Sequence, residues 1–191
     1  MKDAAWGKTP VDHFVRARQE AAGITPNPAA DPRTLIRRVT FDLVGLPPGP
    51  GEVEDFVKEA AADLDGAYSA LLDSLLASDH YGERWARHWL DIVRFAESNG
   101  YAFDGDRPNA WHFRDFVIKA LNSDMPYDEF VRLQIAGDLL ADTSSKTDDQ
   151  ASSAVRSLAA TGFLVAGPYT TQQTQKERER SRYEQLDDIV S

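Results

Sequence analysis

Two histidines of one helical segment are the first residues whose type and spacing could do chemistry. His80 and His88 are eight residues apart, so their imidazoles would lie two helical turns, roughly 11–12 Å, apart. That separation is too large for both to bind one metal ion. His88 alone could still act as an axial haem ligand or a general base, with Asp91 accepting a hydrogen bond from its ring. The structural alternative is a core histidine, because His88 lies between Trp85 and Trp89 on the face expected to be buried.

The segment 97–109 is the second candidate site, because it is rich in oxygen ligands and has no apolar period. Calcium prefers several oxygen ligands from a flexible loop. The EF-hand pattern is not met, since Pro108 stands where that pattern needs a ligand. A tight turn and a helix cap use the same residue types, so this alternative stays open. The residues that could bind a cation are Asp104, Asp106, Asn99, Asn109 and Glu97.

No catalytic residue is predicted. The chain has no cysteine, no Gly-x-Ser-x-Gly sequence and no glycine-rich phosphate loop. Without cysteine, disulfides, thiolate metal sites and covalent haem attachment are excluded within these residues.

The charge distribution argues against nucleic acid and membranes as partners. The 191 residues carry a net charge of −10, and residues 61–150 hold 8 basic against 17 acidic side chains. Nucleic acid and anionic lipid surfaces attract the opposite sign. No apolar run approaches the roughly 20 residues that span a bilayer, so no membrane insertion is expected.

The start and stop signals along the chain are those of helices. Thr9-Pro10, Asp31-Pro32 and Ser78 are typical helix starts. We predict an all-α, single compact domain of about seven to nine helices with long loops. The helices include 50–60, 65–77, 79–97, 150–161 and 174–190, and two more begin at Pro108 and Pro126.

Some segments are predicted in more detail. The segment 98–107 should be a loop, 142–149 a polar loop and 163–169 an extended segment, the only β-like one in the chain. Helical spacing places Trp111, Tyr127 and Ile135 on inward faces. The expected organisation is an unstructured or tag-derived start (1–9), a helical domain (10–170) and a charged C-terminal helix (171–191) leading toward a missing downstream segment.

Long runs in fixed order resemble a known family over almost the whole chain. The family is that of planctomycete cytochrome C domain-containing proteins, in their PSCyt-type domain of unknown function. The runs are VDHFV at 11–15, LIRRVTFDLVGLPP at 35–48, HYGERWARHWLD at 80–91, ESNGY at 97–101, DGDRPNAW at 104–111, PYD at 126–128, QIAGDLL at 134–140 and QLDD at 185–188.

The resemblance implies a large, exported, multidomain bacterial protein, hence an extracytoplasmic location. In the family pattern a Cys-x-x-Cys-His motif follows shortly after the Leu-Asp-Asp sequence, and this motif is the signature of covalent c-type haem. The present chain stops at Ser191, short of that motif. The family supplies no established catalytic residues.

Three functional hypotheses follow. In the first, the chain is the non-catalytic body of a c-type cytochrome-like redox protein, in which His88, His80, Trp85 and Trp89 form part of a haem pocket. In the second, it is a cation-dependent enzyme or binding module for polysaccharide that uses the 97–109 loop, with calcium as the cation. In the third, it is a docking module for neighbouring domains of the same polypeptide.

Overall fold

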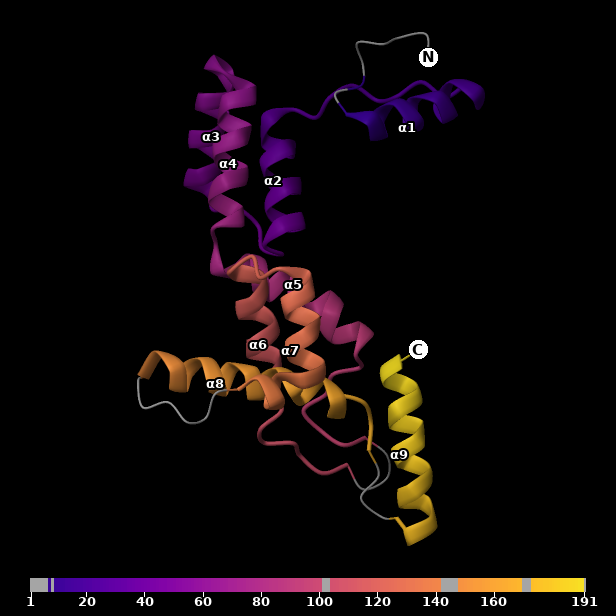
Figure 1. Ribbon diagram of the computed structural model, residues 1–191. Helices are drawn as coiled ribbons and strands as arrows, with labels where there is room; N and C mark the ends of the chain where they lie inside the picture. Colours follow the sequence, from indigo (N-terminus) through magenta and orange to yellow (C-terminus); the bar gives the residue numbers. More distant parts are fainter. Residues whose placement is uncertain (1–6, 8, 101–103, 142–147, 170–172, 191) are drawn as a thin grey trace.

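The computed structural model describes residues 7, 9–100, 104–141, 148–169 and 173–190 (Figure 1), and every regular element in these ranges is helical. The all-α fold and the predicted number of helices are therefore confirmed. Within this part, no helix is long and apolar enough to cross a membrane. The α-helices are α1 (Pro10–Ala21), α2 (Pro32–Leu43), α3 (Pro50–Ala62), α4 (Leu64–Leu76), α5 (Asp79–Ile92), α6 (Trp111–Asn122), α7 (Tyr127–Leu140), α8 (Asp148–Ala160) and α9 (Gln175–Val190), and a 3₁₀ helix, η1, spans Thr161–Val165.

The helix starts follow from short local sequences. Thr9 and Asp12 form a reciprocal capping box, in which the Thr9 backbone N–H donates to Asp12 Oδ2 over 2.8 Å. Asp31 caps α2 by accepting from the Thr34 N–H over 3.1 Å. Such caps satisfy backbone donors that have no partner inside the helix.

A first hydrophobic core lies among α2, α3 and α4. Its buried members are Ile36, Phe56 and Ala67, one from each helix. Arg33 of α2 and Glu54 of α3 form a bidentate, solvent-exposed ion pair beside this core, with N···O distances of 2.7 and 2.9 Å.

A second, larger core joins α5 to α8 and η1. Its buried aromatic residues are Phe113 and Phe116 of α6 and Phe130 of α7. The rings of Phe116 and Phe130 are stacked with centroids 5.6 Å apart. This core holds both candidate sites in place, because α5 and the 97–109 loop connect directly to it.

The first and last helices lie outside both cores. α1 buries none of its residues and sits beside the top of α2, away from the other helices (Figure 1). α9 stands next to the second core, near the end of α5, and it contacts η1.

Several detailed expectations were wrong. The predicted helix 79–97 ends at Ile92, because Arg94 has a positive φ of 54° and the chain reverses there. Residues 163–165 belong to η1 and are not extended. Trp111, Tyr127 and Ile135 are exposed by 43%, 70% and 56%. The predicted loop 142–149 lies largely outside the described residues, as does most of the expected start 1–9.

Candidate functional site

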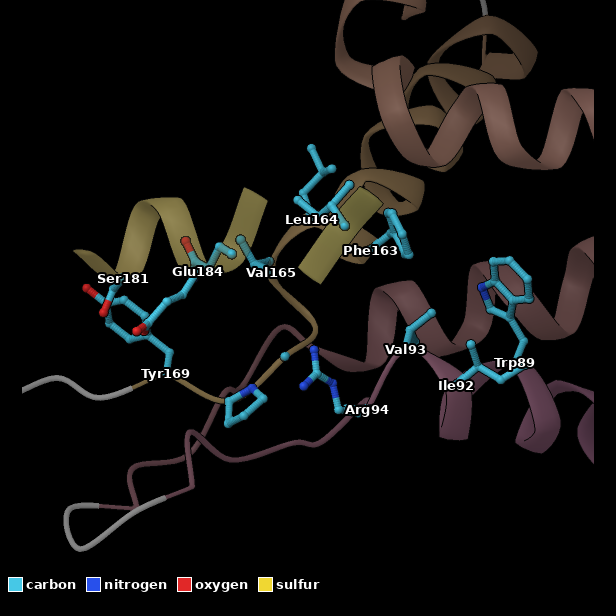
Figure 2. Close-up of a pocket in the computed structure, with 14 residues that line it drawn as sticks. Trp89, Ile92, Val93, Arg94, Phe163, Leu164, Val165, Tyr169, Ser181 and Glu184 are labelled. Carbon is cyan, nitrogen blue, oxygen red and sulfur yellow. The ribbon is translucent and has the colours of Figure 1, made fainter. Parts of the chain in front are cut away.

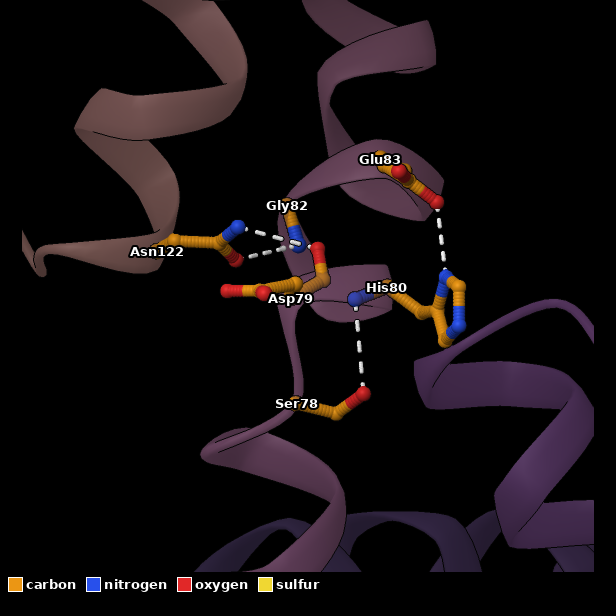
Figure 3. A network of polar contacts seen from close by, with 6 residues as sticks. All are labelled: Ser78, Asp79, His80, Gly82, Glu83 and Asn122. Carbon is orange, nitrogen blue, oxygen red and sulfur yellow. Dashed lines mark hydrogen bonds and ion pairs between the residues drawn. The ribbon is translucent and has the colours of Figure 1, made fainter.

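The N-terminus of α5 is fixed by its own cap and by α6 (Figure 3). Ser78 Oγ accepts from the His80 N–H over 3.3 Å, as the sequence predicts. Asn122 of α6 accepts from the Gly82 N–H over 2.7 Å and donates to the Asp79 carbonyl over 2.9 Å. These bonds orient the whole row of side chains along α5.

His80 is a surface residue in this arrangement. Its Nδ1 lies 2.7 Å from Glu83 Oε2, and both side chains are more than half exposed (Figure 3). His80 does not line the groove that contains His88.

Three of the four predicted haem-pocket residues share one groove. Trp85, His88 and Trp89 line a groove of about 320 Å³ between α5, the end of α6 and the start of α7. The ring centroids of Trp85 and His88 are 5.3 Å apart. His88 is exposed and not a core residue, and within the described ranges no hydrogen bond joins it to Asp91. Met125, which the sequence analysis did not select, also lines this groove.

Trp89 is held rigidly on the inner side of the groove. Its Nε1 donates to Gln134 Oε1 over 2.9 Å, and its ring packs edge-on against Phe130 with centroids 5.1 Å apart. Gln134 is only 1% exposed, and its Nε2 donates to the Phe130 carbonyl over 3.0 Å. Both polar ends of this buried pair are thus satisfied, which keeps the indole in one orientation.

A second cavity, of about 590 Å³, separates the end of α5 from α9 (Figure 2). Trp89 and Ile92 line it on one side, and Glu184 and Ile189 on the other. Trp89 and Ile92 line the His88 groove as well, so the two spaces adjoin.

The 97–109 loop is closed by bonds of its own. The Arg107 N–H donates to the Glu97 carbonyl over 2.7 Å, and the Asn99 N–H donates to the Gly105 carbonyl over 2.9 Å. The Gly100 N–H donates to Asp104 Oδ1 over 2.7 Å. Hydrogen bonds from Ser98 and Gly100 lower the pKa of Asp104 below its ordinary value.

Arg107 ties this loop to the segment before α9. Its Nε donates to Asn99 Oδ1 over 2.8 Å. The two terminal nitrogens donate to the carbonyls of Val165, Ala166 and Gly167 over 2.9–3.1 Å. All three guanidinium nitrogens therefore donate hydrogen bonds, Nε to a side chain and the two terminal nitrogens to the backbone.

The five predicted cation ligands are not gathered around one point. Glu97 forms an ion pair with Arg114, Asp104 accepts from the loop backbone, and the Asn99 oxygen accepts from Arg107. Asn99, Asp106 and Asn109 line a common cavity. In the described part of the chain no three His, Asp or Glu side chains are placed to hold a metal ion. A cation at this loop would need amide or backbone oxygens, and calcium binding stays a prediction.

The shared cavity beside the loop has a volume of about 1180 Å³. It extends from the loop to His112 of α6, Asp138 of α7 and Gln185 of α9. The residues from α6, α7 and α9 could not be found by local spacing, because they come from elements far apart in the sequence.

The comparisons with known proteins identify the family. The profile of PSCyt2, described as a protein of unknown function (DUF1549), matches residues 10–191. The chain belongs to the PSCyt2 family. No curated protein and no solved structure is significantly similar to it. The match confirms the resemblance seen in the sequence, and it assigns no activity to the PSCyt2 domain.

Proposed function

We propose that this PSCyt2 domain is the non-catalytic helical body of an exported, multidomain, c-type cytochrome-like redox protein, and that it supports a haem attached downstream on the same polypeptide. The proposal depends mainly on the position of α9. This helix returns to the end of α5, so that Ile189 and Trp89 line the same cavity (Figure 2). A haem motif shortly after α9, as the family resemblance implies, would emerge beside the groove of His88.

The residues of that groove fit a haem. Histidine nitrogen and methionine sulfur are both common axial ligands, and His88 and Met125 line the same groove. The His88 imidazole is exposed, and no described residue hydrogen-bonds to it. His80 fits less well, because its ring already pairs with Glu83 and it lies outside the groove. When bound, a haem would supply one-electron transfer.

The proposed role of this domain is to provide a rigid, apolar surface against the haem. Trp85 and Trp89 present aromatic surface, and the buried Gln134 keeps the Trp89 indole in place. An apolar surrounding of this kind is one of the factors that set the reduction potential of a haem. No step of bond making is assigned to the domain, in keeping with the absence of a nucleophile motif in the sequence.

Neighbouring domains of the same polypeptide are the proposed partners. Phe14 and Val11 on α1 are exposed by 77% and 68%, and a partner domain would remove this apolar surface from water. The resemblance further supports an extracytoplasmic location, where c-type haem proteins mature.

The test uses the reading frame extended past Ser191, expressed in cells that mature c-type cytochromes. We expect a Soret band that survives denaturation, which marks covalent haem. His88→Ala should shift the native oxidised and reduced spectra, whereas His80→Ala, on the same helix but outside the groove, should leave them unchanged. The histidine of the haem motif leaves one axial position open, so Met125→Leu tests the alternative ligand of the same groove in the same way.

Two results would contradict the proposal. Failure to form any covalent haem in the extended polypeptide would remove the redox role. Identical spectra of the His88→Ala variant and the unmodified protein would show that α5 does not contribute a ligand, and the supporting role would then be limited to packing.

A further inference from the structure

The cavity beside the 97–109 loop has the composition of a small-molecule site. Its volume of about 1180 Å³ is slightly above the roughly 300–1,000 Å³ of ordinary ligand pockets. Its lining is mostly apolar and includes Phe95, Phe113 and Leu164. Such a site typically combines an apolar surface with a few converging polar groups.

Polar side chains from four elements meet at this cavity. Asp106 and Asn109 come from the loop, His112 from α6, Asp138 from α7 and Gln185 from α9. No side-chain hydrogen bond to any of these five is found within the described ranges. Among the described residues their side-chain donors and acceptors are not used in hydrogen bonds, in contrast to those of Arg107 on the same wall.

The free charges at the cavity are negative. Arg107 lines it too, but its guanidinium already donates hydrogen bonds to Asn99 and to the backbone carbonyls of residues 165–167. Among the described residues, the charged side chains at the cavity that make no hydrogen bond are those of Asp106 and Asp138, so an anionic ligand would be repelled. The chain's net charge of −10 acts in the same direction.

A bare metal ion is also a poor match. No three His, Asp or Glu side chains of the described ranges are grouped closely enough to hold one. Two classes of ligand remain, an organic cation and a ligand with several neutral hydroxyl donors and some apolar surface, and the second also uses the mostly apolar lining.

We propose that this cavity binds a neutral carbohydrate without the help of a metal ion. Ionised carboxylates accept hydrogen bonds from hydroxyl groups, and the amides of Asn109 and Gln185 both donate and accept. The apolar faces of a sugar ring would contact the hydrophobic lining. This inference is independent of the haem proposal, because its residues lie outside the His88 groove.

The test is calorimetric titration of the full chain with neutral oligosaccharides: cellotetraose, xylotetraose, laminaritetraose and mannotetraose. Each titration is repeated with added calcium and with EDTA. Glucosamine and galacturonic acid serve as cationic and anionic probes. We expect at least one neutral oligosaccharide to bind equally well with calcium and with EDTA.

Matched variants assign the binding to the cavity. Asp138→Asn and Asp106→Asn should each weaken the affinity about tenfold or more, since a hydrogen bond to a charged group is lost. Asp128→Asn makes the same charge change on α7 but does not line the cavity, and should bind like the unmodified chain.

Each other outcome overturns the proposal. No binding of any of the four neutral oligosaccharides removes the carbohydrate site. Binding of only glucosamine or only galacturonic acid contradicts a neutral ligand, and binding abolished by EDTA contradicts metal independence. Unchanged affinity in both the Asp138 and the Asp106 variant places the sugar elsewhere. Circular dichroism of each variant confirms that it is folded.

Discussion

Arg107 donates four hydrogen bonds, one to Asn99 and three to backbone carbonyls about sixty residues later in the chain. Lysine would keep the positive charge, but it lacks the planar fork that reaches several acceptors at once. We expect Arg107→Lys to lower the free energy of unfolding by about 2 kcal/mol, and the melting temperature by about 4–8 °C. Thermal melting followed by circular dichroism measures this. Arg87→Lys, at an exposed position of α5, is the control. Equal melting temperatures of the two variants would contradict the stabilising role of the Arg107 guanidinium.

The carboxylate of Asp104 makes the loop sensitive to acid. Its pKa is lowered by hydrogen bonds from Ser98 and the Gly100 N–H, so the ionised form is favoured in the folded protein. The resulting stabilisation is present above the ordinary pKa of an aspartate and is lost as the pH falls through the lowered pKa. A carboxyl NMR titration should give Asp104 a midpoint below the pKa of 3.8 of an unperturbed aspartate.

The Ser98→Ala variant tests the cause of that shift. We expect it to move the midpoint of Asp104 upward, because the largest contribution to the lowered pKa is removed. Ser123→Ala, whose hydroxyl bonds to the Ala120 carbonyl at the end of α6, should leave the midpoint in place. A midpoint of Asp104 that is unaffected by Ser98→Ala would assign the shift to the backbone alone.

At the scale of elements, α5 and α6 approach closely at Gly82. A Cβ at this position would lie 2.5 Å from the Ile118 carbonyl oxygen, which no real contact allows. Helix propensity alone predicts that Gly→Ala stabilises a helix by about 0.5–1 kcal/mol. We expect the opposite sign for Gly82→Ala, with a loss of about 1–3 kcal/mol from overpacking. Gly51→Ala in α3, where the Cβ meets nothing within 4 Å, is the matched control and should be neutral or stabilising in denaturant unfolding.

The helix starts could be predicted from the sequence, whereas several ends and faces could not. Thr9, Asp31 and Ser78 act as caps through contacts within three residues, and such local signals are visible in the sequence. The end of α5 is different. The Phe95 N–H bonds back to the Leu90 carbonyl over 2.9 Å, and its ring packs 6.1 Å from that of Phe113. The turn therefore depends on a helix that begins many residues later.

The two candidate sites also combine residues that local spacing predicts with residues that only tertiary packing brings together. Trp85, His88 and Trp89 could be predicted to lie together because they share one helix, and the groove confirms that they are neighbours. Met125 and Asp138 complete the two candidate sites only through the packing of α5, α6, α7 and α8. Their residue types carry no local signal, since an isolated methionine or surface aspartate is found in every soluble protein.

At the scale of the whole molecule, the described part of the chain has two cores, and neither α1 nor α9 belongs to them. The first core contains Ile36, Phe56 and Ala67, and the second core is built around Phe113 and Phe116. α1 buries none of its residues, so its apolar side chains contribute little to the stability of the domain. This exposure is the basis of the proposed contact between α1 and a neighbouring domain.

Deletion of residues 1–29 tests whether α1 contributes to the folding stability of the domain or to contact with another domain. It keeps Asp31, the cap of α2, and removes α1 with its exposed Phe14 and Val11. We expect the melting temperature to change by less than about 2 °C, because α1 contributes no residue to either core. Ile36→Ala, which truncates a side chain that is 1% exposed, should by contrast cost about 2–5 kcal/mol. If the deletion destabilised the domain as much as Ile36→Ala, α1 would be part of its folding unit. If the deletion instead left melting unchanged but weakened association with the adjoining domain in an ultracentrifugation experiment, α1 would be the docking element.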